Sequence, residues 1–282
     1  MKNMHFGKCA LCGQECKLTF EHIPPCSAFN SLPARPVSGL DLLTEKNLDD
    51  ESRLPWETSG LHYQNQQKGN GRYSLCSKCN NNTGSWYGDA YVNFAKTAHS
   101  AIVNCPEDDV SGITFQGIYP LRFAKQVLSM FCSSCSPDSP LLDPIRKFVL
   151  DKDAIGLDKN KYKLCMYLTK STLVKQTGIV ESLKFIDDFK TMTLSEITAY
   201  PFGFVLYLDA STTWDYHGID ITSFADFVYD DIRDVTMPWK IEEMNDIFPE
   251  LYRSREEIMK QREETDQGIS NEILSEGRDK YD

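Results

Sequence analysis

The sequence predicts an α+β protein in which an N-terminal part organised by paired cysteines is followed by a mixed α+β part. Three observations predict this class. Apolar residues make up 41% of the 282-residue chain and charged residues 25%, as in globular proteins that bury a sizeable core. Residues 86–102 and 120–131 repeat apolar residues at the three- and four-residue spacing of helices. Residues 163–168 and 202–208 are short, densely apolar runs, as buried strands are.

The N-terminal part begins with an expected strand, LTFEHI at residues 18–23, whose aromatic and β-branched residues suit a sheet and which the next two prolines end. Residues 26–71 show no period and are rich in proline and glycine, which predicts a long, partly ordered loop. A helix is expected over residues 83–102, capped by Asn82 or Thr83. Its apolar positions, expected in the core, are Trp86, Tyr87, Ala90, Tyr91, Phe94, Ala98 and Ile102.

The C-terminal part follows a break at residues 104–109. Pro120 opens an expected helix that runs to Phe131. Cys132 and Cys135 lie at its C-terminal end, where the helix dipole does not favour a thiolate, so we expect packed thiols and not a redox pair. The further expected elements are a short helix at residues 144–150, strands at 163–168, 172–180 and 202–208, and mixed segments at 219–227 and 241–248.

These elements predict three parts: residues 1–104, an acidic α+β part at 105–250, and a charged helical tail at 251–282. The net charge of −11 belongs to the last two, because residues 1–104 contain 10 Lys and Arg against 9 Asp and Glu. The negative net charge of the whole chain argues against nonspecific coating of nucleic acid, because phosphate contacts require Lys and Arg. The absence of a signal-like segment and of any 18-residue apolar run predicts a cytoplasmic protein with no membrane partner.

Four of the ten cysteines form the two C-x2-C pairs of the N-terminal part. The pairs are Cys9 with Cys12 and Cys76 with Cys79. Four thiolates can close one tetrahedral structural zinc site and tie two distant segments together. The 63 residues between the pairs exceed the usual zinc-ribbon gap of about 15–20, so buried or unrelated thiols are an alternative. Replacement of one ligand by Cys16 or Cys26 is another.

The doublet Glu21–His22 stands at the end of the first strand, and Asn80 directly follows the second cysteine pair. Imidazole exchanges protons near neutral pH, so His22 can take a proton from water. The Glu21 carboxylate and the Asn80 amide oxygen are hard ligands suited to Mg²⁺, with Asn81 as a rival for Asn80. Such a cation binds a nonbridging phosphate oxygen and stabilises a departing 3′ oxygen. The combination favours phosphodiester hydrolysis.

At these residues the chain resembles the HNH endonucleases of the ββα-metal class that carry two C-x2-C knuckles. The matching pieces are Cys9-x2-Cys12, Glu21-His22 followed by Ile-Pro, Asn70 ahead of the second knuckle, and Leu75-Cys76-x2-Cys79-Asn80-Asn81. The match covers roughly residues 8–100. The resemblance implies that His22 is the general base and that Asn70 braces the loop between the two strands. It also implies that Glu21 and Asn80 bind catalytic Mg²⁺ or Mn²⁺, while the four cysteines bind structural Zn²⁺.

The chain departs from this family pattern in three places. Glu21 stands where aspartate is common, Asn80 replaces the final histidine, and the loop at residues 26–68 is long, which lets His62 approach the site. The resemblance implies a nucleic-acid substrate, with DNA expected, and by analogy a role in defence against foreign DNA. The acidic part is expected to recruit a protein partner, form a homo-oligomer or sense a small ligand.

The competing hypothesis is a noncatalytic zinc-binding module that shapes a surface for protein or DNA. In that interpretation His22 is a structural residue or a zinc ligand, Asn70 is a turn residue between two glycines, and the three asparagines at residues 80–82 are helix caps. His99 and His217 have no ligand-spaced neighbours in the sequence and are interpreted as ordinary surface or core residues.

Overall fold

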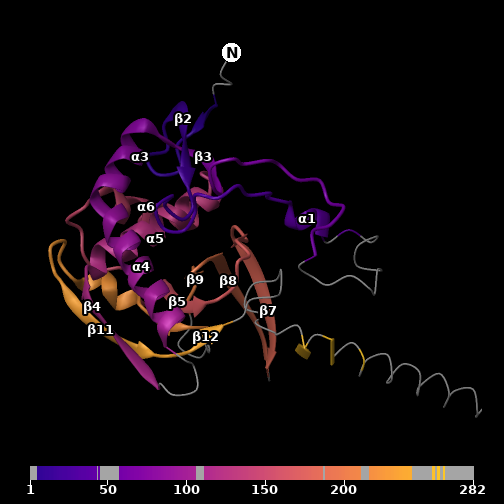
Figure 1. The fold of residues 1–282 in the computed structure, drawn as a ribbon. Helices are drawn as coiled ribbons and strands as arrows, with labels where there is room; N and C mark the ends of the chain where they lie inside the picture. The colour runs from indigo at the N-terminus through magenta and orange to yellow at the C-terminus, as the bar shows by residue number, and fades with distance from the viewer. Residues whose placement is uncertain are drawn as a thin grey trace, which may run out of the picture.

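The fold is mixed α+β, as the sequence predicts (Figure 1). The structure is a computed structural model. It describes residues 5–42, 44, 57–105, 111–186, 188–210, 216–242, 256–257, 259–260 and 263. Most of the expected tail at 251–282, and residues 243–248 of the last mixed segment, lie outside the described residues. Within the described part, no helix is long and apolar enough to cross a membrane.

The N-terminal sheet has three antiparallel strands in the order β1 (Phe6–Lys8), β2 (Glu15–His22) and β3 (Gly71–Cys76). Strand β2 confirms the expected strand and begins three residues earlier. Thr19 pairs with Leu75 and Phe20 with Tyr73, so β3 carries one extra residue between these pairs. Alternation along β2 is therefore unbroken, and successive side chains point to opposite faces.

Helix α3 (Ser77–Thr83) begins directly after β3, six residues before the expected helix start. The expected cap at Asn82 or Thr83 is wrong, because the cap is Cys76, whose sulfur accepts a hydrogen bond from the Cys79 backbone amide at 3.4 Å. The chain continues through a π-helical turn, η1 (Gly84–Gly88), into α4 (Asp89–Asn104). The expected apolar stripe is confirmed as core, since Tyr87, Tyr91 and Phe94 are fully buried.

The C-terminal part confirms both expected helices, which are α5 (Pro120–Ser134) and α6 (Asp143–Leu150). Its main sheet places β10, β5, β9, β8 and β6 side by side, with β12 added on β5 and β7 on β8. The strands are β5 (Lys163–Thr169), β6 (Lys175–Gln176), β7 (Val180–Ile186), β8 (Asp188–Ala199), β9 (Phe202–Tyr207), β10 (Ile219–Asp220) and β12 (Ile241–Glu242). A separate two-stranded ribbon joins β4 (Gly112–Ile118) to β11 (Arg233–Pro238).

One buried apolar cluster runs through the described structure from Cys9 to Trp239. The Phe94 ring on α4 lies 4.8 Å from that of Phe123 on α5 and 5.1 Å from that of Phe202 on β9. Residues on both sides of the expected boundary at 104 thus pack into the same core. The division of the chain into separate domains at that point stays a prediction.

The segment between β2 and β3 is the long loop that the sequence predicts. Its described residues include a short helix, α1 (Gly39–Leu42), and isolated bridges between Ala34 and Gln66 and between Val37 and Tyr63. Figure 1 shows the part that carries α1 extending away from the N-terminal sheet. The loop returns to the sheet through hydrogen bonds beside Asn70, which belong to the candidate site.

Candidate metal centre and active site

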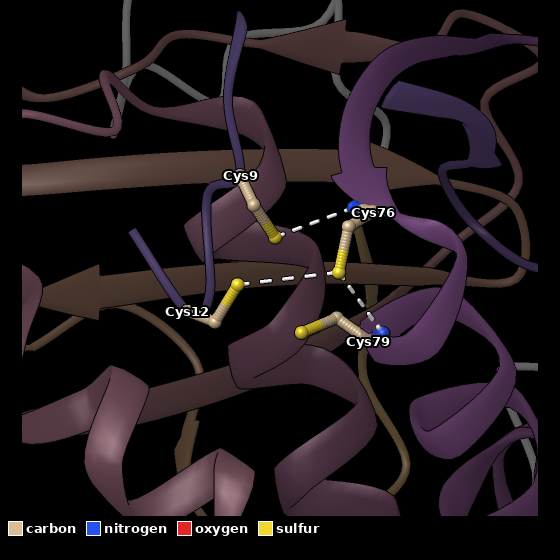
Figure 2. Close-up of side chains that lie close together, drawn as sticks. All are labelled: Cys9, Cys12, Cys76 and Cys79. Atoms are coloured by element: carbon tan, nitrogen blue, oxygen red, sulfur yellow. Dashed lines mark hydrogen bonds between the residues drawn. The ribbon is translucent and has the colours of Figure 1, made fainter. Parts of the chain in front are cut away.

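The two C-x2-C pairs meet at one point, as the sequence predicts. The ligand atoms of Cys9, Cys12, Cys76 and Cys79 all lie within 4.8 Å of one another. Figure 2 shows the four side chains converging from two segments, one after β1 and one spanning the end of β3 and the start of α3. The Cys12 and Cys76 sulfurs are 4.0 Å apart. Among the described residues, Cys26 is not part of this cluster, and Cys16 contacts the Cys76 side chain but is not one of the four mutually close sulfurs.

Backbone amides point at the sulfurs of the cluster. The Cys76 amide donates to the Cys9 sulfur at 3.3 Å, and the Cys79 amide donates to the Cys76 sulfur at 3.4 Å (Figure 2). A hydrogen bond from the Cys79 thiol lowers the pKa of Cys9 to about 4, and the same bond raises the pKa of Cys79. Burial raises the pKa of Cys12. Four sulfurs this close cannot all ionise without a neighbouring positive charge.

This donor set suits a soft divalent cation. Four cysteine sulfurs and no other ligand type form the group, and a four-thiolate set is one that structural zinc sites use. The cluster is therefore positioned to hold a metal ion and is compatible with zinc. A bound dication would supply the positive charge that lets all four thiols lose their protons.

His22 is the last residue of β2 and is half-buried. Its Nε2 lies 2.8 Å from the Lys68 backbone oxygen. A carbonyl oxygen only accepts hydrogen bonds, so Nε2 carries the hydrogen and Nδ1 of the neutral ring keeps a free lone pair. The loop that precedes β3 thereby fixes the tautomer in which Nδ1 can accept a proton.

Asn70 joins the end of β2 to the start of β3. Its side-chain nitrogen donates to the Ile23 oxygen at 3.3 Å, and its backbone oxygen accepts from the Ile23 amide at 3.0 Å. These bonds join Ile23, which follows the Glu21–His22 doublet, to Asn70, which precedes β3. They place Asn70 between the two strand ends.

Asn30 is a residue that the sequence does not single out, yet it fixes Asn70. The residue is 92% buried, and its side chain donates to the Asn70 oxygen at 2.8 Å and accepts from the Asn70 amide at 2.7 Å. It also donates to the Pro24 oxygen at 2.6 Å. Gln66 makes the same two-point contact with the Gly71 backbone, at 3.0 Å for each bond. No spacing or motif identifies either residue. Asn30 bonds the backbone of Asn70, which is distant in sequence, and Gln66 bonds the backbone of Gly71 across a turn.

Glu21 lies one residue before His22 and points to the other face of β2. The residue is 8% exposed, and burial raises the pKa of its carboxyl group to about 7. His22 shares its face with Phe20, whose ring lies 5.1 Å away in an edge-on arrangement. The two residues of the doublet thus differ in setting, with the acid inside the protein and the imidazole half-buried on the outer face.

Asn80, the fourth residue of α3, holds this helix against β2. Its side-chain nitrogen donates to the Thr19 hydroxyl at 3.0 Å and to the Phe20 backbone oxygen at 3.2 Å. Both bonds use the amide nitrogen, so neither uses the amide oxygen. Asn80 therefore lies beside the Phe20–Glu21 peptide, whereas its rival Asn81 is exposed on the helix.

The other candidate histidines are placed away from these contacts. His62 is exposed within the long loop. His99 is a residue of α4, and its Nδ1 lies 2.7 Å from the Tyr200 hydroxyl. His217 contacts the Tyr167 ring edge-on at 5.1 Å. Cys135 lies 3.5 Å from the Ser195 hydroxyl, and both Cys132 and Cys135 are buried, as expected for packed thiols.

Comparison of the chain with protein-family models, curated proteins and solved structures finds no match.

Proposed function

We propose that this chain is a metal-dependent HNH endonuclease of the ββα-metal class that hydrolyses phosphodiester bonds in nucleic acid, with DNA as the expected polymer. One observation carries the proposal. Helix α3 begins at the second cysteine pair and lies against β2 so that Asn80 bonds the carbonyl of Phe20, one residue before Glu21–His22. Two antiparallel strands and a helix thus carry the residue types that this chemistry uses, with Glu21 and Asn80 beside one face of β2 and His22 on the other.

In this proposal the four-cysteine cluster holds Zn²⁺ and fixes the geometry without entering the reaction. It joins the turn after β1 to the junction of β3 and α3, so it sets where α3 starts relative to β2. The oxygen donors for a catalytic Mg²⁺ or Mn²⁺ are the Glu21 carboxylate and the Asn80 amide oxygen, which are hard ligands. A cation bound there supplies Lewis-acid stabilisation of phosphate charge.

His22 acts as the general base. Its Nε2–H is held by the Lys68 oxygen, which leaves Nδ1 to take a proton from the attacking water. The water oxygen bonds to phosphorus as the bond from phosphorus to the 3′ oxygen breaks. Asn70 holds the strand ends at the distance that this orientation of His22 requires, through its bonds to Ile23.

The test is cleavage of plasmid DNA with added Mg²⁺ or Mn²⁺. Loss of a general base costs on the order of 100-fold or more, so we expect His22→Ala to lower the cleavage rate by at least that factor. His62→Ala is the matched control, because His62 is exposed in the long loop, and its rate should equal that of the wild type. An unchanged rate in His22→Ala would remove His22 from the mechanism.

A noncatalytic zinc module is the second candidate, and the opposite orientations of Glu21 and His22 favour it. In such a module the buried Glu21 and the His22 ring packed against Phe20 would serve only to stabilise the sheet, so they would not have to share a face. Titration with Mn²⁺ separates the two functions. The nuclease should bind one weakly held Mn²⁺ per zinc-loaded chain and lose it in Glu21→Gln, whereas the module should bind none.

A further inference from the structure

The outer face of the N-terminal sheet carries a row of four rings that ends at His22. We call His22, Phe20, Tyr73 and His5 the ring row. The Phe20 ring lies 5.1 Å from that of His22 and 5.4 Å from that of Tyr73, each edge-on. Tyr73 in turn stacks on His5 with ring centroids 3.6 Å apart and planes 16° from parallel.

The ring row is accessible from outside the protein. Tyr73 is 45% exposed, His5 is exposed, and Phe20 and His22 are half-buried. Burying a tyrosine ring is favourable, and one left this open on a sheet contributes little to the core that packs on the opposite face. The row is therefore not accounted for by packing of the sheet alone.

Among the residues of the three strands, the face that bears the ring row carries no formal charge, because strand pairing places Lys8, Lys17 and Arg72 on the opposite face together with the two carboxylates. Alternation along β2 sends both carboxylates of the strand, Glu15 and Glu21, to the opposite face. The face that bears the ring row contains two imidazoles and, among the residues of the three strands, no carboxylate. Nothing in these strands therefore repels a phosphate chain that approaches His22 from this side.

We propose that the ring row binds the unpaired bases of single-stranded nucleic acid and leads the strand to His22. Aromatic side chains stack on bases of any sequence, but only where the flat face of the base is free, which base pairing and stacking in a duplex prevent. The inference rests on the proposed nuclease function, because it names the substrate of that site as an unpaired strand. It predicts that double-stranded nucleic acid is the poorer ligand.

Binding is measured by fluorescence anisotropy with a labelled single-stranded oligonucleotide, the matching duplex, and RNA of the same sequence, without added Mg²⁺ or Mn²⁺. The dissociation constant for the single strand should be lower than for the duplex. Because base–aromatic stacking is substantial, Tyr73→Leu should weaken single-strand binding about tenfold, while Tyr73→Phe, which keeps the ring, should bind like the wild type. Preference for RNA over DNA would support the ring row and assign the polymer as RNA.

The matched control is Tyr63→Leu, since Tyr63 is 44% exposed but lies in the long loop outside the ring row. Its affinity should be unchanged. Duplex binding as tight as single-strand binding, or wild-type affinity in Tyr73→Leu, would overturn the inference. Because binding is read without cleavage, a protein that binds single strands through Tyr73 but never cuts them would refute the nuclease function and leave the binding surface standing.

Discussion

Glu21 carries an ionisable group into the interior, and this makes stability depend on pH. Burial raises the pKa of its carboxyl group from 4.5 to about 7, so the folded state binds the proton more tightly than the unfolded chain does. The stabilisation from that proton is complete below about pH 4.5 and is lost as pH rises through 7. Above that range the folded protein holds a buried charge unless a cation neutralises it.

We therefore expect Glu21→Gln, which mimics the protonated acid, to stabilise the protein at pH 8 and to change little at pH 4.5. One pKa unit corresponds to about 1.4 kcal/mol, so the gain at pH 8 should be on the order of 3 kcal/mol without added Mn²⁺. Urea unfolding at both pH values measures it. Equal effects of the substitution at the two pH values would show that the Glu21 carboxyl does not titrate in this way.

Asn30 acts on the candidate site through the backbone of Asn70. Asn30→Ala removes three hydrogen bonds and leaves buried backbone groups unpaired, which should cost about 2–3 kcal/mol of unfolding free energy. The proposed cleavage should also slow, because the strand end that holds His22 loses its support. Asn93→Ala, at an exposed position of α4, is the control and should stay close to wild-type stability. A stable Asn30→Ala protein would contradict this role.

At the scale of the elements, Gly71 sets how closely β3 approaches β2. A Cβ atom there would lie 2.1 Å from the Glu21 backbone oxygen and 2.8 Å from the Phe20 ring, so the strands would have to separate. Gly71→Ala should destabilise the protein by about 2 kcal/mol, as overpacking does. Gly84→Ala meets no atom within 4 Å and sits in a helical turn, so it should stabilise by about 0.5–1 kcal/mol. Thermal unfolding compares them, and equal melting temperatures would refute the close approach.

The sequence predicts those elements that carry their own signal. The helical apolar spacing from Pro120 predicts α5, and the dense apolar run at residues 202–208 predicts β9. The paired cysteines predict the four-cysteine cluster. The start of α3 was missed because its cap is a thiol, Cys76, which also belongs to the metal cluster. Strands β4 and β11 were missed because they pair mainly with each other and keep exposed residues, which weakens their apolar pattern.

The candidate site is predictable only in part, for a physical reason. Sulfur ligands and the acid–histidine doublet are recognisable because their chemistry restricts residue type and spacing. Asn30 and Gln66 bond backbone atoms, and any backbone offers the same atoms, so their partners depend on the folded loop and not on a motif. The opposite faces of Glu21 and His22 likewise become clear only when β2 is paired with β3.

At the scale of the whole molecule, the shared core links the cysteine-bearing part to the C-terminal sheet. The Phe94 ring contacts the Phe115, Phe123 and Phe202 rings, all beyond residue 104. We expect loss of helical circular dichroism and release of zinc to coincide in one unfolding transition. Phe94→Ala should lower the midpoint of both signals together, at a cost of about 3–5 kcal/mol. Two separate transitions would instead show that residues 1–104 fold as an independent domain.

The proposed site depends most on one zinc ion held by both cysteine pairs, because the four-cysteine cluster positions α3, β2 and His22. The most direct test is X-ray absorption at the zinc edge, together with the metal content of the purified chain. We expect one zinc per chain with four sulfur neighbours at about 2.3 Å. Two zinc ions per chain, or a nitrogen or oxygen neighbour in place of a sulfur, would contradict it.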